Sequence, residues 1–206
     1  MRLLVLGASG RTGTEVVKQA LAAGHEVTAF VRDPAKLSVA DPHLSVKVGD
    51  AKSAADLRDA VQGQDAVVST LGSNKAGDEL ITTSTKALID AMRHSGVKRV
   101  AMLSTVAVAP NLRPTGPMRL LRFMMKGLLA DKSSGEALLR RSDLDWTIVY
   151  ATGLQDGPRT GNYRVVGPTE TVAPSGKVAR ADVAEFLLKQ VEESGSVRQS
   201  PVITPA

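Results

Sequence analysis

Cysteine is absent from this chain of 206 residues, which excludes disulfide bonds, thiolate chemistry and cysteine metal sites. Histidine is scarce: His25, His43 and His94 lie far apart, and no spacing places two of them on one helix face. We therefore predict no metal site. Aromatic residues make up only 3% of the chain, which argues against the stacking surface that single-stranded nucleic acid requires.

Long apolar runs are also missing. No stretch approaches the ~20 apolar residues that cross a bilayer. The apolar start at Leu3 to Leu6 is too short for a signal-peptide core. We expect a soluble, cytoplasmic protein with no membrane partner.

Basic residues exceed acidic ones and give a formal net charge of +5. Such a charge suits an anionic partner, namely nucleic acid, acidic lipid or a phosphorylated cofactor. The basic residues are scattered, however, and short pairs such as Arg140 with Arg141 are typical of solvated helix ends. We therefore predict no nucleic-acid partner.

What the chain does contain, at its start, is an apolar run followed by three glycines spaced three apart. Leu3 to Leu6 is typical of a buried strand, and Gly7, Gly10 and Gly13 follow it directly. A phosphate group can approach a main chain closely only where side chains are absent, and a helix that begins near Arg11 would point free N–H groups at it. Glycine turns are common, but this one stands between a strand and an amphipathic run, as the dinucleotide motif requires. We interpret the stretch as a pyrophosphate site.

The rest of the chain alternates apolar runs with amphipathic ones. Continuous apolar runs indicate strands buried on both faces, as in a parallel sheet covered by helices. We predict a single α/β domain over residues 1–206, with a Rossmann-type, doubly wound parallel β-sheet and helices on both faces. Segments at about 106–135 and 150–177 would form the pocket. Further strands are expected at Glu26 to Val31, Leu44 to Val48, Ala66 to Leu71, Val100 to Leu103, Trp146 to Val149 and Val202 to Ile203. Helices are expected at Thr14 to Ala23, Ser53 to Val61, Glu79 to Ser95, Leu120 to Leu129, Glu136 to Arg141 and Val178 to Val191. The polar stretch Asp131 to Gly135 is expected to separate the helix at Leu120 to Leu129 from the helix at Glu136 to Arg141.

The end of the second strand discriminates between cofactors. An acidic residue there binds the adenosine ribose of NAD(H), whereas an arginine accommodates the 2′-phosphate of NADP(H). Arg32 holds that position, and Arg11 could reach the same phosphate from the other side. We predict a preference for NADP(H), with NAD(H) possible. The alternative is that Arg32 is a solvated loop residue and Asp33 turns inward to the ribose.

Polar or small residues follow three later strands, where ligands of an open α/β sheet bind. Asp50, with the backbone of Ala51, could meet the adenine amino edge, and Asp50 could also cap the helix that starts near Ser53. Gly72 would let the ribose and pyrophosphate pass over the backbone. The Ser104 and Thr105 hydroxyls would face the nicotinamide, although a Ser-Thr pair after a strand is commonly a turn or cap.

The motifs resemble the atypical short-chain dehydrogenase/reductase group with NAD(P)-binding, NmrA-like folds, and most of all its flavin reductase/biliverdin IXβ reductase branch. The first half carries the specific similarity and the second half a looser one. The motifs are GASGRTG at Gly7 to Gly13, AFVRDP at Ala29 to Pro34, VGDA at Val48 to Ala51, GQDAVVSTLG at Gly63 to Gly72, SGVKRVAMLST at Ser95 to Thr105 and TGNYRVV at Thr160 to Val166.

The resemblance implies NADPH-dependent hydride transfer to a small planar acceptor, such as a flavin, a biliverdin-like tetrapyrrole or a quinone. The segment Asp131 to Arg141 and the pair Tyr150-Ala151 depart from the reductases of the group, and these departures concern the acceptor. Carried over by position, the cofactor-binding residues would be Gly7, Ser9, Gly10, Arg11, Thr12, Gly13, Arg32, Asp50, Ala51, Leu71, Gly72 and Ser104, with Ser104 and Thr105 as the catalytic residues.

Carbonyl-reducing members of the wider superfamily use a tyrosine followed four residues later by a lysine, which lowers the pKa of the phenol. Leu154 stands four residues after Tyr150, and Gly167 stands four after Tyr163, so the dyad is absent. A flavin or quinone can take hydride directly and collect its proton from water. The absence favours a reductase of such acceptors.

It equally fits a non-catalytic NmrA-like sensor that binds NADP(H) and another protein. In the reductase interpretation, the loops Val106 to Pro117 and Gly153 to Gly167 form an open apolar pocket. The sensor would instead show an exposed apolar patch along Met118 to Leu129, a stretch that core packing also explains. A monomer and a homodimer are both compatible with the sequence.

Overall fold

The computed structural model describes residues 1–72, 77–109, 119, 123–166 and 176–206. Their centre is an eight-stranded sheet in the order β3-β2-β1-β4-β5-β6-β10-β8. The strands from β3 to β10 in this order pair in parallel, and only β8 is antiparallel, to β10. The predicted Rossmann-type fold is confirmed. The strands are β1 (Arg2–Leu6), β2 (Glu26–Val31), β3 (Leu44–Val48), β4 (Ala66–Ser69), β5 (Arg99–Thr105), β6 (Asp145–Ala151), β8 (Tyr163–Val166) and β10 (Val202–Pro205).

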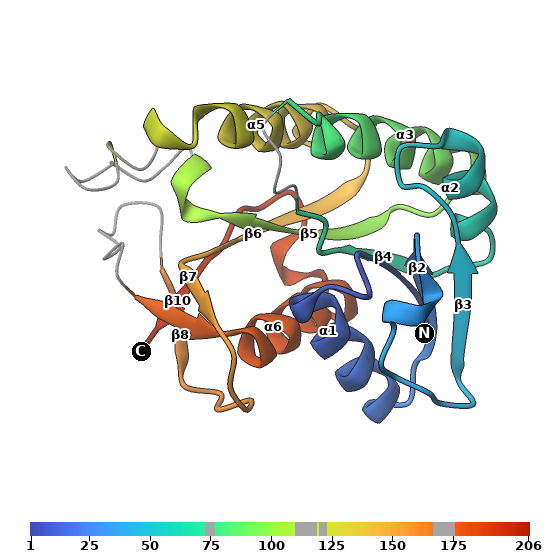
Figure 1. The fold of residues 1–206 in the computed structure, drawn as a ribbon, viewed down its shortest axis with the longest axis horizontal. Helices are drawn as coiled ribbons and strands as arrows, with labels where there is room; N and C mark the ends of the chain where they lie inside the picture. Colours follow the sequence, from blue (N-terminus) through green and yellow to red (C-terminus); the bar gives the residue numbers. More distant parts are fainter. Residues whose placement is uncertain (73–76, 110–118, 120–122, 167–175) are drawn as a thin grey trace.

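Helices cover both faces of this sheet (Figure 1). One layer packs α2 (Ala54–Val61) and α5 (Lys126–Arg140) against α3 (Leu80–Ser95), and the other pairs α1 (Arg11–Ala22) with α6 (Arg180–Glu192). Side chains of a strand alternate between the two layers, because successive Cβ atoms point to opposite faces. In β1, Leu4 and Leu6 join the core under α2 and α3, while Leu3 and Val5 join the core over α1 and α6.

The chain order reverses between β1 and β4. The strands β2 and β3 extend the sheet to one side of β1, and β4, β5 and β6 extend it to the other. At such a switch point the connections leave in opposite directions and open a crevice at the carboxyl ends of the strands. The crevice therefore lies beside the glycine turn that follows β1.

The segment from Gly153 to Gly167, predicted as a loop, contains regular structure. Its described part begins with β7 (Gly153–Gln155), which pairs in parallel with β9 (Lys177–Ala179), and ends with β8. The intervening turn is fixed by the buried Asp182 of α6, whose carboxylate accepts hydrogen bonds from the backbone N–H groups of Thr160 and Gly161. The alternation in β7, β8 and β9 is too short to be read from sequence.

The predicted break at Asp131 to Gly135 is wrong, because α5 runs through it without interruption. Three of the five polar or small residues in this stretch have tertiary partners. The Asp131 carboxylate accepts hydrogen bonds of 2.9 Å from the backbone N–H groups of Ile81 and Thr82 and so caps α3, whose own N-cap residue supplies no side-chain cap. A Cβ on Gly135 would lie 3.0 Å from the carbonyl oxygen of Ile81, so the two helices touch there. The third residue, Lys132, belongs to the site described below.

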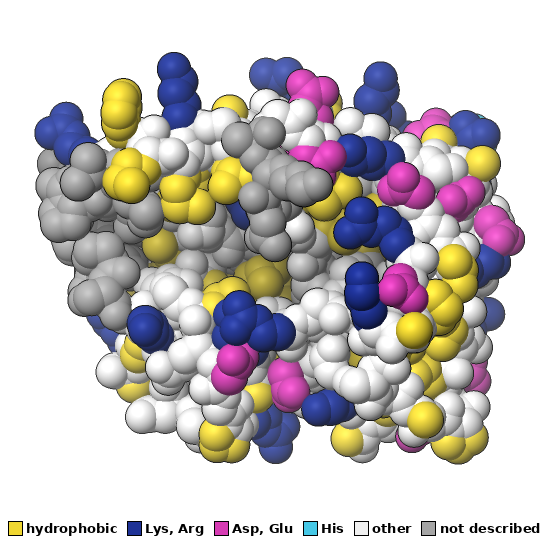
Figure 2. Space-filling model, viewed as in Figure 1, with side chains coloured by type: hydrophobic (Ala, Val, Ile, Leu, Met, Phe, Trp, Pro, Cys, Tyr) yellow, Lys and Arg dark blue, Asp and Glu magenta, His cyan; other side chains and the backbone are white. Residues whose placement is uncertain are grey.

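Figure 2 shows Lys and Arg side chains spread over the visible face and interspersed with Asp and Glu, in agreement with their scatter in the sequence. No helix in the described part of the chain is long and apolar enough to cross a bilayer.

Candidate cofactor and acceptor site

The glycine turn is built for close backbone contact. Gly7 adopts φ +77°, a left-handed conformation that glycine accepts without strain. The Gly7 carbonyl oxygen accepts a hydrogen bond of 2.9 Å from the Gly10 N–H. A Cβ on Gly13 would lie only 2.1 Å from that same oxygen. The first turn of α1 can therefore pack on the end of β1 only with glycine at this position.

A cleft with a volume of about 210 Å³ opens beside this turn, at the switch point of the sheet. Its wall brings together residues that the sequence places far apart, from the ends of β1, β2, β3 and β4. Eight of the predicted cofactor residues line it, namely Gly7, Ser9, Gly10, Arg32, Asp50, Ala51, Leu71 and Gly72. Phe30, Val31, Gly49, Thr70 and Leu80 complete the lining.

Four predicted cofactor residues do not line the cleft, and one of them, Ser104, lines the second cavity described below. Thr12 and Gly13 are buried in the first turn of α1. Arg11 is exposed at the helix start, and its guanidinium donates to the Asp156 carboxylate at 3.3 Å. The same carboxylate accepts a 2.7 Å bond from the mostly buried Arg180, which ties the segment after β7 to α6. Arg11 thus stands at the rim of the cleft, held by an acidic side chain from the far half of the chain.

The structure separates Arg32 from Asp33. Arg32 is exposed on the cleft wall. The Asp33 carboxylate instead accepts the Ala35 N–H at 3.1 Å and caps the short 3-10 helix Pro34–Lys36. Asp33 is therefore turned into its own loop, away from the place where it would meet a ribose.

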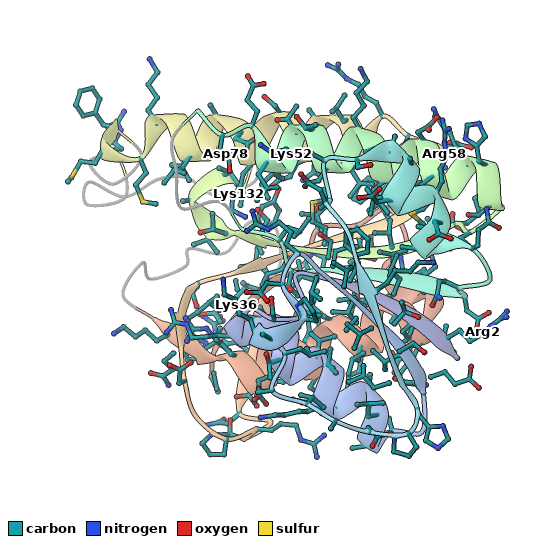
Figure 3. All side chains as sticks on the ribbon, turned by 45° about the vertical axis from the view of Figure 1, so that its right-hand side comes forward. Arg2, Lys36, Lys52, Arg58, Asp78 and Lys132 are labelled. Atoms are coloured by element: carbon teal, nitrogen blue, oxygen red, sulfur yellow. The ribbon has the colours of Figure 1, made fainter. Side chains whose placement is uncertain are left out.

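Asp50 and its neighbours form the other rim. The Asp50 carboxylate accepts the Lys52 N–H at 3.0 Å, whereas the cap of α2 is Ser53, whose hydroxyl accepts the Asp56 N–H. The alternative role of Asp50 as the helix cap is thereby corrected. The Lys52 ammonium reaches across to Asp78 at 2.6 Å and joins this turn to the segment before α3 (Figure 3).

A second cavity, about the size of one water molecule, lies beyond Leu71, which borders both spaces. Ser104 lines it, and its place beside the nicotinamide stays a prediction. Thr105 does not, because its hydroxyl accepts the Ala107 N–H and caps the 3-10 helix Val106–Val108. Of the two residues predicted to be catalytic, Ser104 therefore lines the cavity and Thr105 caps a helix.

Behind Ser104 stands a buried carboxyl that the sequence reasoning missed. The Ser104 hydroxyl donates to Glu136 Oε1 at 2.5 Å, and the Tyr150 phenol donates to Glu136 Oε2. Arg140 in turn donates to the phenol oxygen at 2.7 Å and lies 5.2 Å from the centre of the Trp146 ring. Glu136 is 4% exposed and Tyr150 1% exposed, so this network is shielded from bulk water.

Burial sets the protonation of this network. Desolvation raises the pKa of Glu136, against the hydrogen bonds from Ser104 and Tyr150 and the positive charges of Arg140 and Lys132, which lower it. Desolvation, and after it the neighbouring Glu136, also raises the pKa of Tyr150. The phenol therefore stays neutral and acts as a donor at physiological pH.

Lys132 is the second residue that sequence reasoning missed. It points from α5 toward the sheet (Figure 3) and lines the same cavity as Ser104 and Glu136. Desolvation lowers the pKa of its ammonium, while Glu136 and Asp131 raise it. A signal existed in the sequence: Lys132 and Glu136 are spaced by four and so share one helix face, but they stood in or beside the stretch interpreted as a break.

Only part of the predicted pocket walls can be located. Residues 110–117 of the first loop and 167–175 of the second lie outside the described residues. Of the predicted apolar patch, Met118 and residues 120–122 also lie outside them. Phe123 is 77% exposed and Met124 75% exposed, whereas Leu129 is buried in the core. Among the described residues, no group of three or more His, Asp or Glu side chains is placed to hold a metal ion.

The sequence pattern of the NAD(P)H-binding family matches residues 7–194. An uncharacterized chloroplastic protein of Arabidopsis thaliana, At2g34460, is 30% identical over all of this chain and 77% of its own. Two solved structures share the fold. A short-chain dehydrogenase/reductase of Veillonella parvula in complex with NADP has a TM-score of 0.81 at 16% identity, over 98% of this chain and 93% of its own. ChuY, an anaerobilin reductase of Escherichia coli O157:H7, has a TM-score of 0.80 at 21% identity, over 98% and 96%.

Proposed function

Because this chain belongs to the NAD(P)H-binding family, we propose that it is an NADPH-dependent reductase that transfers hydride to a small planar acceptor, such as a flavin, a tetrapyrrole or a quinone. The observation that carries the proposal is the junction at Leu71. Leu71 lines both the cleft at the switch point of the sheet and the cavity of Ser104, Lys132 and Glu136.

The residues present fit a dinucleotide. A Cβ on Gly7 or Gly13 would come within 3.0 Å of atoms of the chain itself, so these glycines let the start of α1 and the end of β4 pack closely against the turn after β1, the tight strand–helix geometry of pyrophosphate sites in this fold. The free N–H groups at the start of α1 would bind the pyrophosphate, and Leu71 and Gly72 would lie along the ribose. Asp50 and the backbone of Ala51 would meet the adenine.

The preference for NADPH rests on the contrast between Arg32 and Asp33. Arg32 lines the cleft at the end of β2, where a 2′-phosphate would lie, and the Asp33 carboxylate accepts a hydrogen bond within its own loop. Arg32→Ala should weaken NADPH binding roughly 10- to 100-fold, since a charge-assisted hydrogen bond contributes about 1.5–3 kcal/mol. NADH binding should change by less than about twofold.

Calorimetric titration of both cofactors measures this difference. Arg58→Ala is the matched control, because Arg58 is a half-exposed arginine that pairs with Asp90 on α3, outside the cleft lining. Equal loss of NADPH and NADH affinity in Arg32→Ala would show that Arg32 does not serve the 2′-phosphate.

When bound, reduced nicotinamide supplies the hydride. The chain's task is to place the acceptor and to exclude water, because a positioned planar ring needs little else to accept hydride. Lys132 and Ser104 line a water-sized cavity, so they would meet a single polar atom of an acceptor or a ribose that lies in the cleft beside it. ChuY, an anaerobilin reductase by its name, has the same fold, which supports a reductase as the proposal.

The test is NADPH oxidation by the purified protein with FMN, biliverdin and 1,4-naphthoquinone, each supplied separately. We expect turnover with at least one acceptor, and Ser104→Ala should lower kcat for it. Cofactor binding without turnover of any acceptor would refute the reductase. It would favour a cofactor-binding sensor, for which exposed Phe123 and Met124 offer a binding surface.

A further inference from the structure

The transfer of hydride alone does not require the buried Glu136 carboxyl that is hydrogen-bonded to Ser104. Reduction of a quinone, flavin or tetrapyrrole by hydride adds two electrons and one proton equivalent to carbon or nitrogen, and the product needs a second proton on a heteroatom. The acceptor could take this proton from water. In this chain, however, a buried network ends at a water-sized cavity, beside the cleft in which the acceptor would react.

We propose that Glu136 is the proton reservoir of this reaction and passes its proton through Ser104 to the heteroatom of the acceptor, an inference that rests on the proposed reductase function. Ser104 is the catalytic residue, because it faces the cavity. Glu136 is a positioning and proton-supplying residue that acts through Ser104. Tyr150 and Arg140 hold Glu136 in place from the side away from the cavity.

The hydrogen-bond geometry allows this sequence of transfers. Glu136 uses its two carboxyl oxygens for two different partners, Oε1 for Ser104 and Oε2 for Tyr150. A neutral Glu136 can therefore donate from Oε1 to the Ser104 oxygen, which leaves the Ser104 proton free for the acceptor. The Ser104 O–H bond breaks as the acceptor O–H or N–H bond forms, and the Glu136 proton replaces it on Ser104.

The charges around Glu136 suit both of its protonation states. From its own helix it faces Lys132 and Arg140, from β5 the neutral Ser104, and from β6 the neutral Tyr150. The uncharged hydroxyls of Ser84 and Thr85 on α3 line the same cavity. Burial favours the neutral acid before the reaction, and the Tyr150 hydrogen bond with the two cations stabilises the carboxylate after it. Water that enters the cavity once the product leaves returns the proton.

A second observation marks the cavity as a polar path. The Thr85 hydroxyl is 2% exposed, lines the cavity, and has no hydrogen-bond partner among the described residues. A buried hydroxyl without a partner is costly, and a cavity of this size can admit a water molecule or a polar atom of a ligand beside it.

The experiment compares Glu136→Gln with the wild-type protein in NADPH oxidation by FMN, biliverdin and 1,4-naphthoquinone. Glutamine keeps the shape and can still bond both neighbours, but it stores no transferable proton. We expect kcat to fall at least tenfold with the NADPH dissociation constant unchanged. The wild-type kcat should decrease toward alkaline pH and show a solvent deuterium effect, and both features should be lost in Glu136→Gln.

Two further variants separate proton supply from structure. Tyr150→Phe keeps the carboxyl but removes one donor to it, so the alkaline decrease in kcat should shift while activity at low pH persists. Glu185→Gln, on α6 at the opposite face of the sheet, is the matched control and should retain the wild-type pH profile. Unchanged kcat, pH profile and isotope effect in Glu136→Gln would overturn the relay and leave the reductase function intact.

A readout without turnover distinguishes the two proposals. Infrared difference spectra of wild-type protein against Glu136→Gln should show the carbonyl stretch of a neutral carboxylic acid near neutral pH. Absence of this band would overturn the relay, whatever the activity. If the band is present but wild-type protein reduces none of the acceptors, the reductase function fails and the relay falls with it, while the neutral carboxyl stands as a structural feature.

Discussion

Replacing Asp131 by alanine should remove the hydrogen bonds by which α5 caps the start of α3. The carboxylate on α5 is the side-chain cap of α3, and it accepts two backbone N–H groups, each at 2.9 Å. The residue before α3, Glu79, has φ +47° and supplies no cap of its own. Without Asp131, both N–H groups at the helix start would depend on water.

The size of the effect follows from these contacts. Loss of an N-cap costs about 0.5–2 kcal/mol, and loss of a negative charge at a helix N-terminus costs a further ~0.3–1 kcal/mol. We expect a decrease of about 2 kcal/mol in the free energy of unfolding. With a denaturant slope of ~2 kcal/mol/M, this lowers the urea midpoint by about 1 M. Asp131→Asn, which keeps one acceptor and loses the charge, should show roughly half of this loss.

Urea unfolding followed by circular dichroism measures the midpoint and the slope together. Asp59→Ala is the control: Asp59 is an exposed carboxylate on α2 that pairs with Lys47 and caps no helix. Surface pairs contribute ~0–1 kcal/mol, so its midpoint should change little. If Asp131→Ala and Asp59→Ala gave the same midpoint at an unchanged slope, capping across the two helices would not stabilise the fold.

Two further predictions concern the cofactor turn and the acid limit of stability. Gly13→Ala places a Cβ 2.1 Å from the Gly7 oxygen, so it should destabilise the fold by ~1–3 kcal/mol and weaken both NADPH and NADH; wild-type melting temperature and affinity would contradict the packing at this turn. Asp143 is held by Arg93 at 2.8 Å and Lys98 at 3.0 Å, which keeps its pKa well below the usual range. A lowered folded-state pKa stabilises the protein above the unfolded value of ~3.9 and loses this effect as pH falls below it, so Asp143→Asn should lower the urea midpoint at pH 7 and progressively less below pH 4. If the urea midpoint of Asp143→Asn stayed below that of the wild-type protein by the same amount at every pH, the ionised Asp143 would not be the source of this stability.

The sequence predicted the fold and the cleft because both depend on local patterns. Buried parallel strands are continuous apolar runs, and the glycines act within a few residues of one another, as the Gly7–Gly10 contact shows. The helix predicted at Glu79 to Ser95 ends as its sequence indicates, because Gly96 follows it with φ +79°, a conformation that other residues adopt with strain. The position of Arg32 on the cleft wall likewise follows from its place at the end of β2.

The second cavity depends on contacts that no local pattern contains. Ser104 and Glu136 are 32 residues apart, and Asp131 caps a helix 50 residues earlier in the chain. Periodicity reports which residues face the core, but it does not report which buried polar groups find partners there. A buried glutamate is stable only where donors surround it, and those donors come from three separate elements.

The mistaken break in α5 shows how such a site can be recognised. Asp131, Lys132 and Gly135 each violate the apolar pattern of a helix that covers a sheet, and each violation has a specific tertiary reason: a cap, a cavity and a close helix contact. The stretch contains turn-favouring Asp, Ser and Gly, but good helix formers stand before and after it and no proline interrupts it. Polar residues between two helical patterns can therefore also mark a helix face that is directed at a partner or a site. In this protein that interpretation leads from the sequence to Lys132 and Glu136 and, through Glu136, to Ser104.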